Sequence, residues 1–194
     1  MSVGTRSIEH MFDTLDEPAL LAEMADAQRG ERVVVARRVL ATGRLCQSRM
    51  SGLLGDDRAT WCIDNWAATA AEVGAHLGMS QERASVQMNQ GLELLERLPR
   101  VAEAFAAGEV EYRVIATLVF RTGLITDDAV MARIDEVLSR RVRWFNTLSR
   151  KRLAAAIDKW VAEVDPAAVR TAREARENRY IEFGEAIEGM VRFW

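Results

Sequence analysis

The fold is decided by the stretch AATAAEVGAHLGMSQERASVQMNQGLELLERL, residues 67–98. Its first half repeats small and apolar residues at the spacing of one helical face. Gly78 suits the left-handed conformation that ends a helix, and the Ser80 hydroxyl suits the N-cap of the next one. A second apolar stripe then follows at Ala84, Met88, Leu92 and Leu95. The stretch predicts two helices joined by a tight turn, in the outline of a helix-turn-helix.

A DNA-reading helix presents cations and amides near its start, where they can reach base edges in the major groove. The second helix of this pair offers such side chains at Ser80, Gln81, Arg83 and Gln87. The same outline describes any pair of helices with a glycine corner, and Glu82 lies beside these residues. A purely structural helix pair therefore remains an open alternative.

The rest of the chain also favours helices. Only three of its 194 residues are proline, whereas alanine, leucine, glutamate and arginine are abundant. Apolar residues make up 49% and charged residues 28%, as in an ordinary globular protein. We expect an all-α fold, mostly a helical bundle, with one helical domain over residues 1–165. Residues 166–194 are expected to add a basic helix and the start of a short β-hairpin.

Local signals place the other elements. Asp16 can cap a helix that has Pro18 in its first turn, and one long or broken helix is expected from there to about residue 50, weakened by Gly30 and Gly43. Residues 51–60 look like a loop, followed by Trp61 and Trp66 as expected core anchors. Further helices are predicted over about 100–107, 109–121 and 127–140, and a last one from 147 or 149 to between 160 and 164.

Charge and cysteine usage limit the function classes. The net charge is −3, so the whole chain exerts no general attraction on nucleic acid or on an anionic membrane, and any such binding must come from a local patch. Cys46 and Cys62 do not form a metal-binding or redox pair, which favours a reducing compartment. With no signal peptide and no apolar run of membrane-spanning length, we expect a cytoplasmic protein without a membrane partner.

No catalytic chemistry is evident in the sequence. The two histidines, His10 and His76, have no metal ligands at a suitable spacing. A nucleophile elbow, a phosphate-binding loop and a dinucleotide fingerprint are also lacking. We predict no catalytic residue, no metal site and no cofactor.

The strongest local patch is SRRVRWFNTLSRKR, residues 139–152, which contains no acidic residue. Cations can bind phosphates, and an aromatic ring such as Trp144 can stack on a base. Alternatively, Trp144 and Phe145 fill the core at a helix junction while the cations oppose a helix dipole. The candidate phosphate-binding residues of this patch are Arg140, Arg141, Arg143, Arg150, Lys151 and Arg152.

Three stretches together resemble a known family: AAEVGAHLGMSQERAS, LELLERLPRVAEAFAAGEVEYRVIATLVFRTGLITD and SRKRLAAAIDKWVAEVDPAAVR. They are similar to the mycobacterial thirteen-E-twelve repeat family, whose N-terminal region is domain of unknown function 222. The resemblance covers roughly residues 16–194. It implies a helical domain, often followed in longer members by an HNH endonuclease module, which here would lie beyond residue 194. It supplies no catalytic residue to carry over.

Two functional hypotheses follow. The first is a non-catalytic DNA-binding or targeting module, with the start of the second helix entering a groove and residues 140–152 holding phosphates. The second is a protein-interaction or homo-oligomerisation scaffold without nucleic-acid binding, suggested by the net acidity and by long amphipathic helices that could pair across a two-fold axis. An enzyme is the least favoured interpretation.

Overall fold

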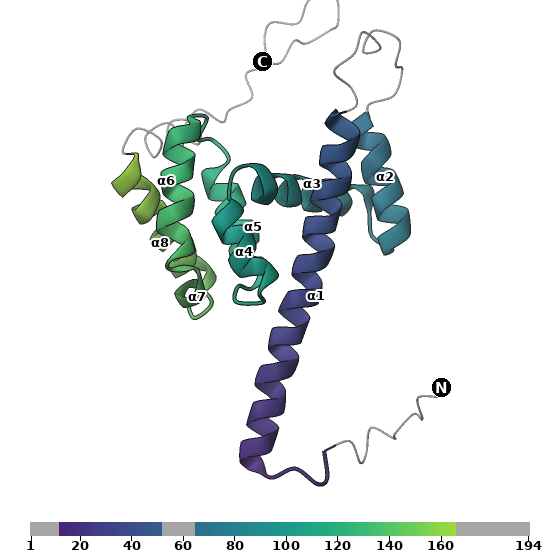
Figure 1. Cartoon of the computed structure of the whole chain (residues 1–194), viewed down its shortest axis with the longest axis vertical. Helices are drawn as coiled ribbons and strands as arrows, with labels where there is room; N and C mark the ends of the chain where they lie inside the picture. The colour runs from purple at the N-terminus through teal and green to yellow at the C-terminus, as the bar shows by residue number, and fades with distance from the viewer. Residues whose placement is uncertain (1–11, 52–64, 166–194) are drawn as a thin grey trace, which may run out of the picture.

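The computed structural model describes residues 12–51 and 65–165 (Figure 1). These residues form helices and contain no strand, so the predicted all-α class is confirmed. The helices are α1 (Glu17–Ser51), α2 (Asn65–Leu77), α3 (Gln81–Glu96), α4 (Pro99–Ala106), α5 (Tyr112–Thr122), α6 (Asp128–Ser139), α7 (Val142–Phe145) and α8 (Arg150–Val164). Trp61, Cys62, the loop after residue 51 and the predicted basic helix and hairpin lie outside the described residues.

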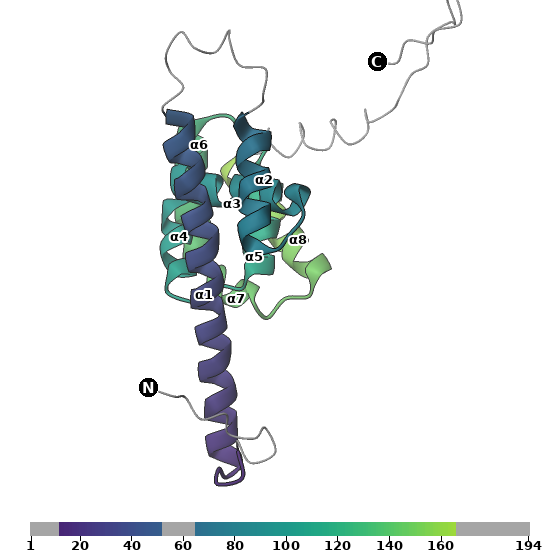
Figure 2. The same ribbon diagram turned by 90° about the vertical axis from the view of Figure 1, so that its right-hand side faces the viewer.

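Helix α1 is one unbroken rod of 35 residues. Its start follows the predicted cap, because the backbone N–H of Ala19 donates to Asp16 Oδ1 at 2.9 Å. The N-terminal part of α1 runs well past the other helices, and every residue from 21 to 31 is exposed (Figures 1 and 2). The rod therefore has a packed C-terminal half and a projecting N-terminal part.

Helices α1 and α3 cross where two glycines meet. A Cβ atom built on Gly43 would lie 2.4 Å from the backbone carbon of Gly91, and one on Gly91 would lie 2.4 Å from the carbonyl oxygen of Val39. Only residues without a side chain allow the two backbones to approach this closely. The sequence predicted one long or broken helix weakened at Gly43, and the structure shows an unbroken helix in which Gly43 is the point of contact with α3.

The predicted helix pair of residues 67–98 is present as α2 and α3. Gly78 takes a φ of 62°, and the N–H of Met79 donates to the carbonyl of Gly74 at 2.9 Å, which closes the end of α2. Gly108, with a φ of 73°, ends α4 in the same way. The tight turns at both glycines follow from the local sequence.

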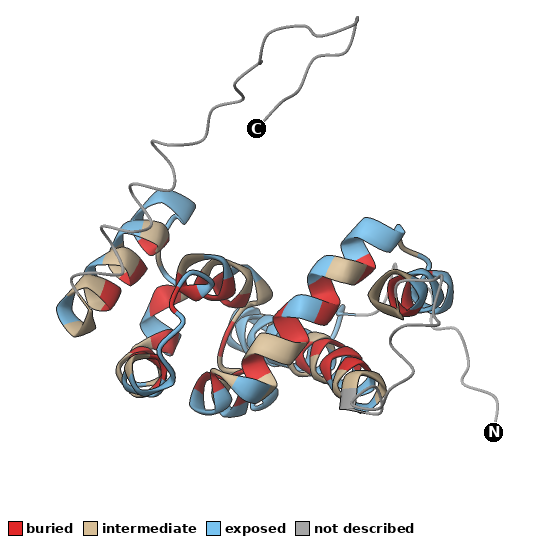
Figure 3. Ribbon diagram, turned by 90° about the horizontal axis from the view of Figure 1, so that it is seen from above, coloured by how far each residue is buried: buried red, intermediate tan, exposed pale blue. Residues whose placement is uncertain are grey.

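The described core consists of two clusters of buried apolar side chains. The larger one joins α1 and α3 to α8 and includes Phe105, Leu118 and Phe145. The smaller one joins the end of α1 to α2 and α3 and is centred on Met88 with Cys46, as expected for a buried cysteine. Seen from above, the buried positions lie on the inward faces of the helices (Figure 3). No described helix is long and apolar enough to cross a bilayer.

Candidate nucleic-acid interface

The turn between α2 and α3 places three of the predicted residues at the surface. Ser80 is the N-cap of α3, and its hydroxyl accepts the backbone N–H of Arg83 at 3.3 Å. The Gln81 amide donates to the carbonyl of Ala67 at 3.0 Å, which ties the start of α3 to α2. The Arg83 side chain is exposed and has no partner among residues 12–51 and 65–165. Among the predicted residues of this turn, Arg83 is thus the cation that could bind a phosphate without breaking a contact within the described residues.

Gln87 does not belong to that surface. Its side chain is 3% exposed, and its Nε2 donates to Oγ1 of Thr42 at 2.9 Å. The Thr42 hydroxyl in turn donates to the carbonyl of Arg38 at 2.9 Å. The polar residue that the sequence suggested for a DNA groove instead bonds α3 to α1 inside the protein, so we remove it from the candidate contacts.

A second exposed cation, Arg38 of α1, acts on the same phenol as Arg83. Burial raises the pKa of the Tyr112 phenol, while the charges of Arg38 and Arg83 both lower it. The Tyr112 hydroxyl donates to Oε1 of Gln90 at 2.5 Å, which holds the ring between α3 and α5. The charges of Arg38 of α1 and Arg83 of α3 therefore both act at Tyr112, a relation that sequence spacing could not reveal.

Several cations of the 139–152 patch are occupied within the protein. Arg140 pairs with Glu136 one turn earlier on the same helix. The guanidinium of Arg141 lies 3.7 Å from the centre of the Trp160 ring, and its Nη1 donates to the carbonyl of Val137 at 2.9 Å. These two arginines serve the junction between α6 and α8, and their predicted contact with phosphates would require breaking such interactions.

Arg143 belongs to a clamp that fastens α7 to the α4–α5 loop. Its Nε donates to Oε2 of Glu109 at 2.9 Å, and this hydrogen bond lowers the pKa of the Glu109 carboxyl. The Asn146 side chain accepts from the backbone N–H of Glu111 at 3.0 Å and donates to the carbonyl of Glu109 at 2.7 Å. The short helix α7, which the sequence did not predict, is held by these polar contacts and by buried Phe145.

The start of α8 leaves a different set of side chains free. Arg150, Lys151 and Arg152 are exposed and have no partner within the described part of the chain. Trp144 is also half exposed, at 52%, whereas Phe145 is in the core. The interpretation of the pair as core side chains therefore holds for Phe145, while the ring of Trp144 is exposed and its stacking on a base stays a prediction.

The two groups of free cations lie apart. In Figure 1, α2 is at one side of the fold and α8 at the other, with α5 and α6 between them. Helix α8 packs on α5 and α6, while α2 packs on α1 and α3. The structure therefore divides the predicted site residues into an α3 group and an α8 group rather than one compact cluster.

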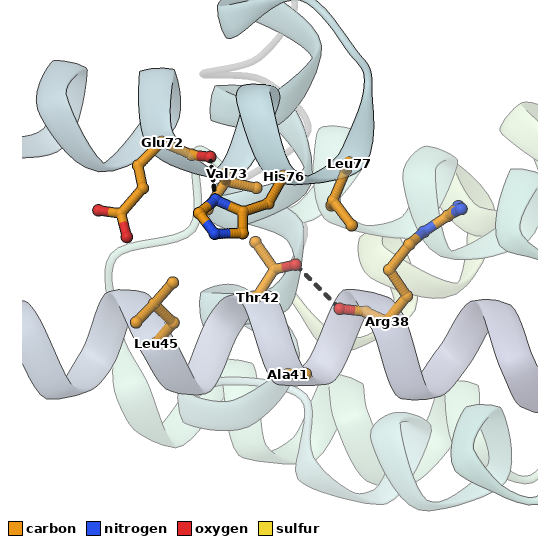
Figure 4. A pocket seen from close by; sticks show the side chains of 8 residues that line it. All are labelled: Arg38, Ala41, Thr42, Leu45, Glu72, Val73, His76 and Leu77. Carbon is orange, nitrogen blue, oxygen red and sulfur yellow. Dashed lines mark hydrogen bonds between the residues drawn. The ribbon is translucent and has the colours of Figure 1, made fainter.

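A groove of about 350 Å³ lies beside the α2–α3 turn, between α1 and α2 (Figure 4). Its lining is mainly apolar and comes from Ala41 and Leu45 of α1 and from Val73 and Leu77 of α2. Arg38, Thr42, Glu72 and His76 complete it. Glu72 is engaged by Arg49 at 2.7 Å, which lowers the pKa of the Glu72 carboxyl. This groove has the lining of a docking site for apolar side chains rather than of a catalytic centre.

A second hollow, of about 560 Å³, lies where α4 meets α6. Its buried acid, Asp135, accepts the backbone N–H groups of Arg100 and Val101, each at 3.0 Å, and so caps α4 from another helix. Burial raises the pKa of this carboxyl. Within residues 12–51 and 65–165, no three His, Cys, Asp or Glu side chains are grouped to hold a metal ion.

Residues 26–193 match the model of a protein family described as a domain of unknown function, DUF222. The chain belongs to this family. Its members among curated proteins include an uncharacterised protein encoded in the est 3′ region of Mycobacterium tuberculosis, 38% identical over 92% of this chain and 51% of that protein. A further uncharacterised protein of strain H37Rv is 38% identical over 92% of this chain and 34% of its own length. No solved structure matches the chain.

The DUF222 chain described here spans between about a third and about half of the length of these relatives. The family match confirms the resemblance seen in the ERLP…FAAGE and DPAAVR segments of the sequence.

Proposed function

We propose that this DUF222 chain is a non-catalytic DNA-binding module that targets a longer protein to DNA. The observation that carries the proposal is the distribution of free cations. Arg32, Arg49, Arg97 and Arg121 are each paired with a carboxylate, as are several other arginines. The start of α8 and the start of α3 carry exposed cations without a partner among the described residues.

Free cations suit phosphate binding because no internal ion pair has to be broken before they meet the backbone of DNA. Three consecutive cations at the start of α8 and half-exposed Trp144 nearby in the chain combine charge with a ring that can stack on a base. Ser80, Gln81 and Arg83 at the start of α3 add a second point of contact. Because the net charge of the chain is −3, attraction to DNA has to come from these local groups of cations and not from the charge of the whole chain.

In the longer proteins, we expect this module to position a second activity on DNA. The resemblance described above associates the family with HNH endonucleases, and the curated relatives extend well beyond the region that the chain covers. Targeting by phosphate contacts alone gives binding with little sequence preference.

The test is a titration of labelled duplex DNA, followed by fluorescence anisotropy at several salt concentrations. Replacing Arg150, Lys151 and Arg152 with alanine should weaken binding at low salt and reduce the slope of log affinity against log salt by about three, roughly one for each phosphate contact. A matched control removes three other exposed cations, Arg29, Arg133 and Lys159. Equal loss in both variants, or binding that is unchanged in the first, would refute the assignment to α8.

The scaffold hypothesis also has an observation in its favour. The projecting part of α1 exposes Leu21 and Met24, at 66% and 67%, and neither belongs to a core cluster of the described residues. Exposed apolar helix faces of this kind mark contacts with other proteins. Failure to bind either duplex or single-stranded DNA even at low salt would favour this second hypothesis.

A further inference from the structure

Helix α1 carries a regular stripe along one side. Its positions alternate in steps of four and three, which is the spacing of a coiled-coil seam. From Met24 onward every position is exposed, with Met24 at 67% and Val34 at 65%, and only the first, Leu20, is half-buried. The eight positions are Leu20, Met24, Ala27, Glu31, Val34, Arg38, Ala41 and Leu45.

The second half of this seam is one wall of the groove between α1 and α2. Arg38, Ala41 and Leu45 all line the groove, opposite Val73 and Leu77 of α2 (Figure 4). Two antiparallel helices with an apolar groove between them can accept the apolar face of a third helix. The groove therefore fits a helix that presents small or flexible apolar side chains.

The first half of the seam is such a helix. It lies in the N-terminal part of α1, which projects past the other described helices (Figure 2), and Met24 and Ala27 are both exposed. The buried contacts of α1 begin near Gly108, which approaches Arg29 and Val33 on a different side of the helix. Within residues 12–51 and 65–165, each molecule thus has an open groove and an exposed helix face on the same seam.

The charges on α1 are arranged by sign along its length. Acidic residues predominate in the first half, at Glu17, Glu23 and Asp26, with Glu31 in the middle of the seam. The second half has the cations Arg37, Arg38, Arg44 and Arg49 and no acid. Two such helices attract each other when they run in opposite directions and repel when they run in parallel.

We propose that two copies of this chain pair through α1 in antiparallel orientation, so that the projecting helix of each copy fills the α1–α2 groove of the other. In one register, each of the eight seam positions of one copy lies opposite a seam position of the second copy. The residue numbers of each opposed pair add to 65 in this register. Leu20 of one copy lies opposite Leu45 of the second copy, and Met24 lies opposite Ala41. The two-fold axis passes between residues 32 and 33.

This register also pairs the charges. Glu23, which flanks the seam, lies next to Arg44 of the second copy, and the symmetry repeats the pair. Glu31 and Arg38 are the two charged seam positions. Glu31 of one copy and Arg38 of the second copy belong to neighbouring opposed pairs, so their charges can attract each other across the interface. The matched span from Leu20 to Leu45 is about 38 Å long at 1.5 Å per residue. A closed two-fold dimer is the expected assembly, and it does not depend on DNA binding.

The first test is the oligomeric state of the purified chain, measured by sedimentation equilibrium from micromolar to millimolar concentration. The chain should dimerise, and Met24→Glu should weaken the dimer roughly tenfold or more, because a charge would enter the groove. Leu124→Glu is the matched control, since Leu124 is also exposed, at 56%, but lies outside α1. Both positions are at the surface, so both variants are expected to fold.

The second test identifies orientation. In a Cys62→Ser background, in which the remaining native cysteine, Cys46, is buried, a mixture of Met24→Cys and Ala41→Cys chains should form a covalent dimer on mild oxidation. Met24→Cys alone should not, because the two copies of residue 24 are separated along the seam by 17 positions, about 25 Å. A charge exchange gives a third test: Glu23→Arg and Arg44→Glu should each weaken the dimer, and the double variant should restore it.

A chain that is monomeric at every concentration would overturn the proposal and leave the groove to a different protein or to another part of a longer chain. A dimer that Met24→Glu does not weaken would place the interface elsewhere and overturn it as well. Cross-linking of Met24→Cys to itself would refute the antiparallel register. Loss of DNA affinity has no bearing on any of these outcomes, so the two proposals fail independently.

Discussion

Replacement of Gly43 by alanine tests the crossing of α1 and α3 most directly. The new Cβ atom would lie 2.4 Å from the backbone carbon of Gly91, which is 1.0 Å short of the lower limit of an ordinary contact at 3.4 Å. The atoms it meets are backbone, not the end of a flexible side chain, so the helices themselves have to separate. If the helices separate by about 1 Å to relieve this overlap, the side chains packed between α1 and α3 lose between about a quarter and a half of their dispersion energy.

The magnitude follows from two opposing effects. Overpacking of a core costs about 1–3 kcal/mol where side chains can adjust, and we take a higher cost of about 3–5 kcal/mol here because the atoms in the way are backbone, while alanine in place of glycine inside a helix gains about 1 kcal/mol. We expect Gly43→Ala to lower the free energy of unfolding by about 2–4 kcal/mol. For a domain of this size the midpoint of thermal unfolding should fall by roughly 4–16 °C.

The matched control is Gly30→Ala in the same helix. Gly30 is exposed, and a Cβ atom there would have nothing within 4 Å. This variant should therefore gain about 0.5–1 kcal/mol from helix propensity alone. Thermal and urea unfolding followed by circular dichroism would measure both variants. If Gly43→Ala were as stable as Gly30→Ala, the close approach of α1 and α3 would be refuted.

Three further predictions concern buried or paired polar groups. Asp135→Ala should lower stability by about 2 kcal/mol in urea unfolding, more than Asp127→Ala, because Asp135 caps one buried and one part-buried N–H group and Asp127 only one exposed group. Gln87→Ala should destabilise the fold by about 1–3 kcal/mol but leave the DNA affinity of the folded protein unchanged; a selective loss of affinity would contradict the interior role of Gln87. The Glu109 carboxyl has a lowered pKa in the folded state, so its ion pair with Arg143 stabilises the protein above the ordinary value of 4.5, and this contribution is lost as the pH falls through the folded pKa. The stability difference between the parent chain and Glu109→Gln should therefore shrink in acid, and a difference that grew below pH 4.5 would contradict the pairing.

The parts of the fold that follow from neighbouring residues could be predicted from the sequence. Asp16, Gly78 and Ser80 act where the chain itself places them, within one turn of a helix end. The breaks at Pro99 and Gly108 and the start of α6 at Asp127 are equally local. The all-α class and the helix pair were confirmed for this reason.

Features that depend on distant partners could not be predicted in the same way. Gly43 looked like a weak point because its partner, Gly91, is 48 positions away in the sequence. Gln87 looked like a groove contact because nothing local reveals Thr42. The cations of residues 139–152 looked alike in sequence, and only Glu109, Glu136 and Trp160 separate the engaged ones from the free ones.

The proposed pairing of two α1 helices follows a pattern that the sequence contains. Positions from Leu20 to Leu45 recur in steps of four and three, which is the spacing of a coiled-coil seam. The sequence predicted pairing of amphipathic helices only in general terms, because the exposure of this side of α1 and the groove beside it depend on the packing of α2. Whether the candidate DNA contacts are real stays a prediction, because phosphate binding leaves little trace in an amino-acid pattern.

The division of the core into two clusters has a consequence for how the molecule opens. The buried apolar side chains of α2 belong to the smaller cluster, around Met88, whereas α5 is enclosed by the larger one. Regions with few buried contacts exchange their amide hydrogens through partial openings that leave the remainder folded. Amides of Val73 and its neighbours in α2 should therefore exchange well before those of Leu118, and α2 forms a separate cooperative unit that can detach while α1, α3 and the rest keep their positions.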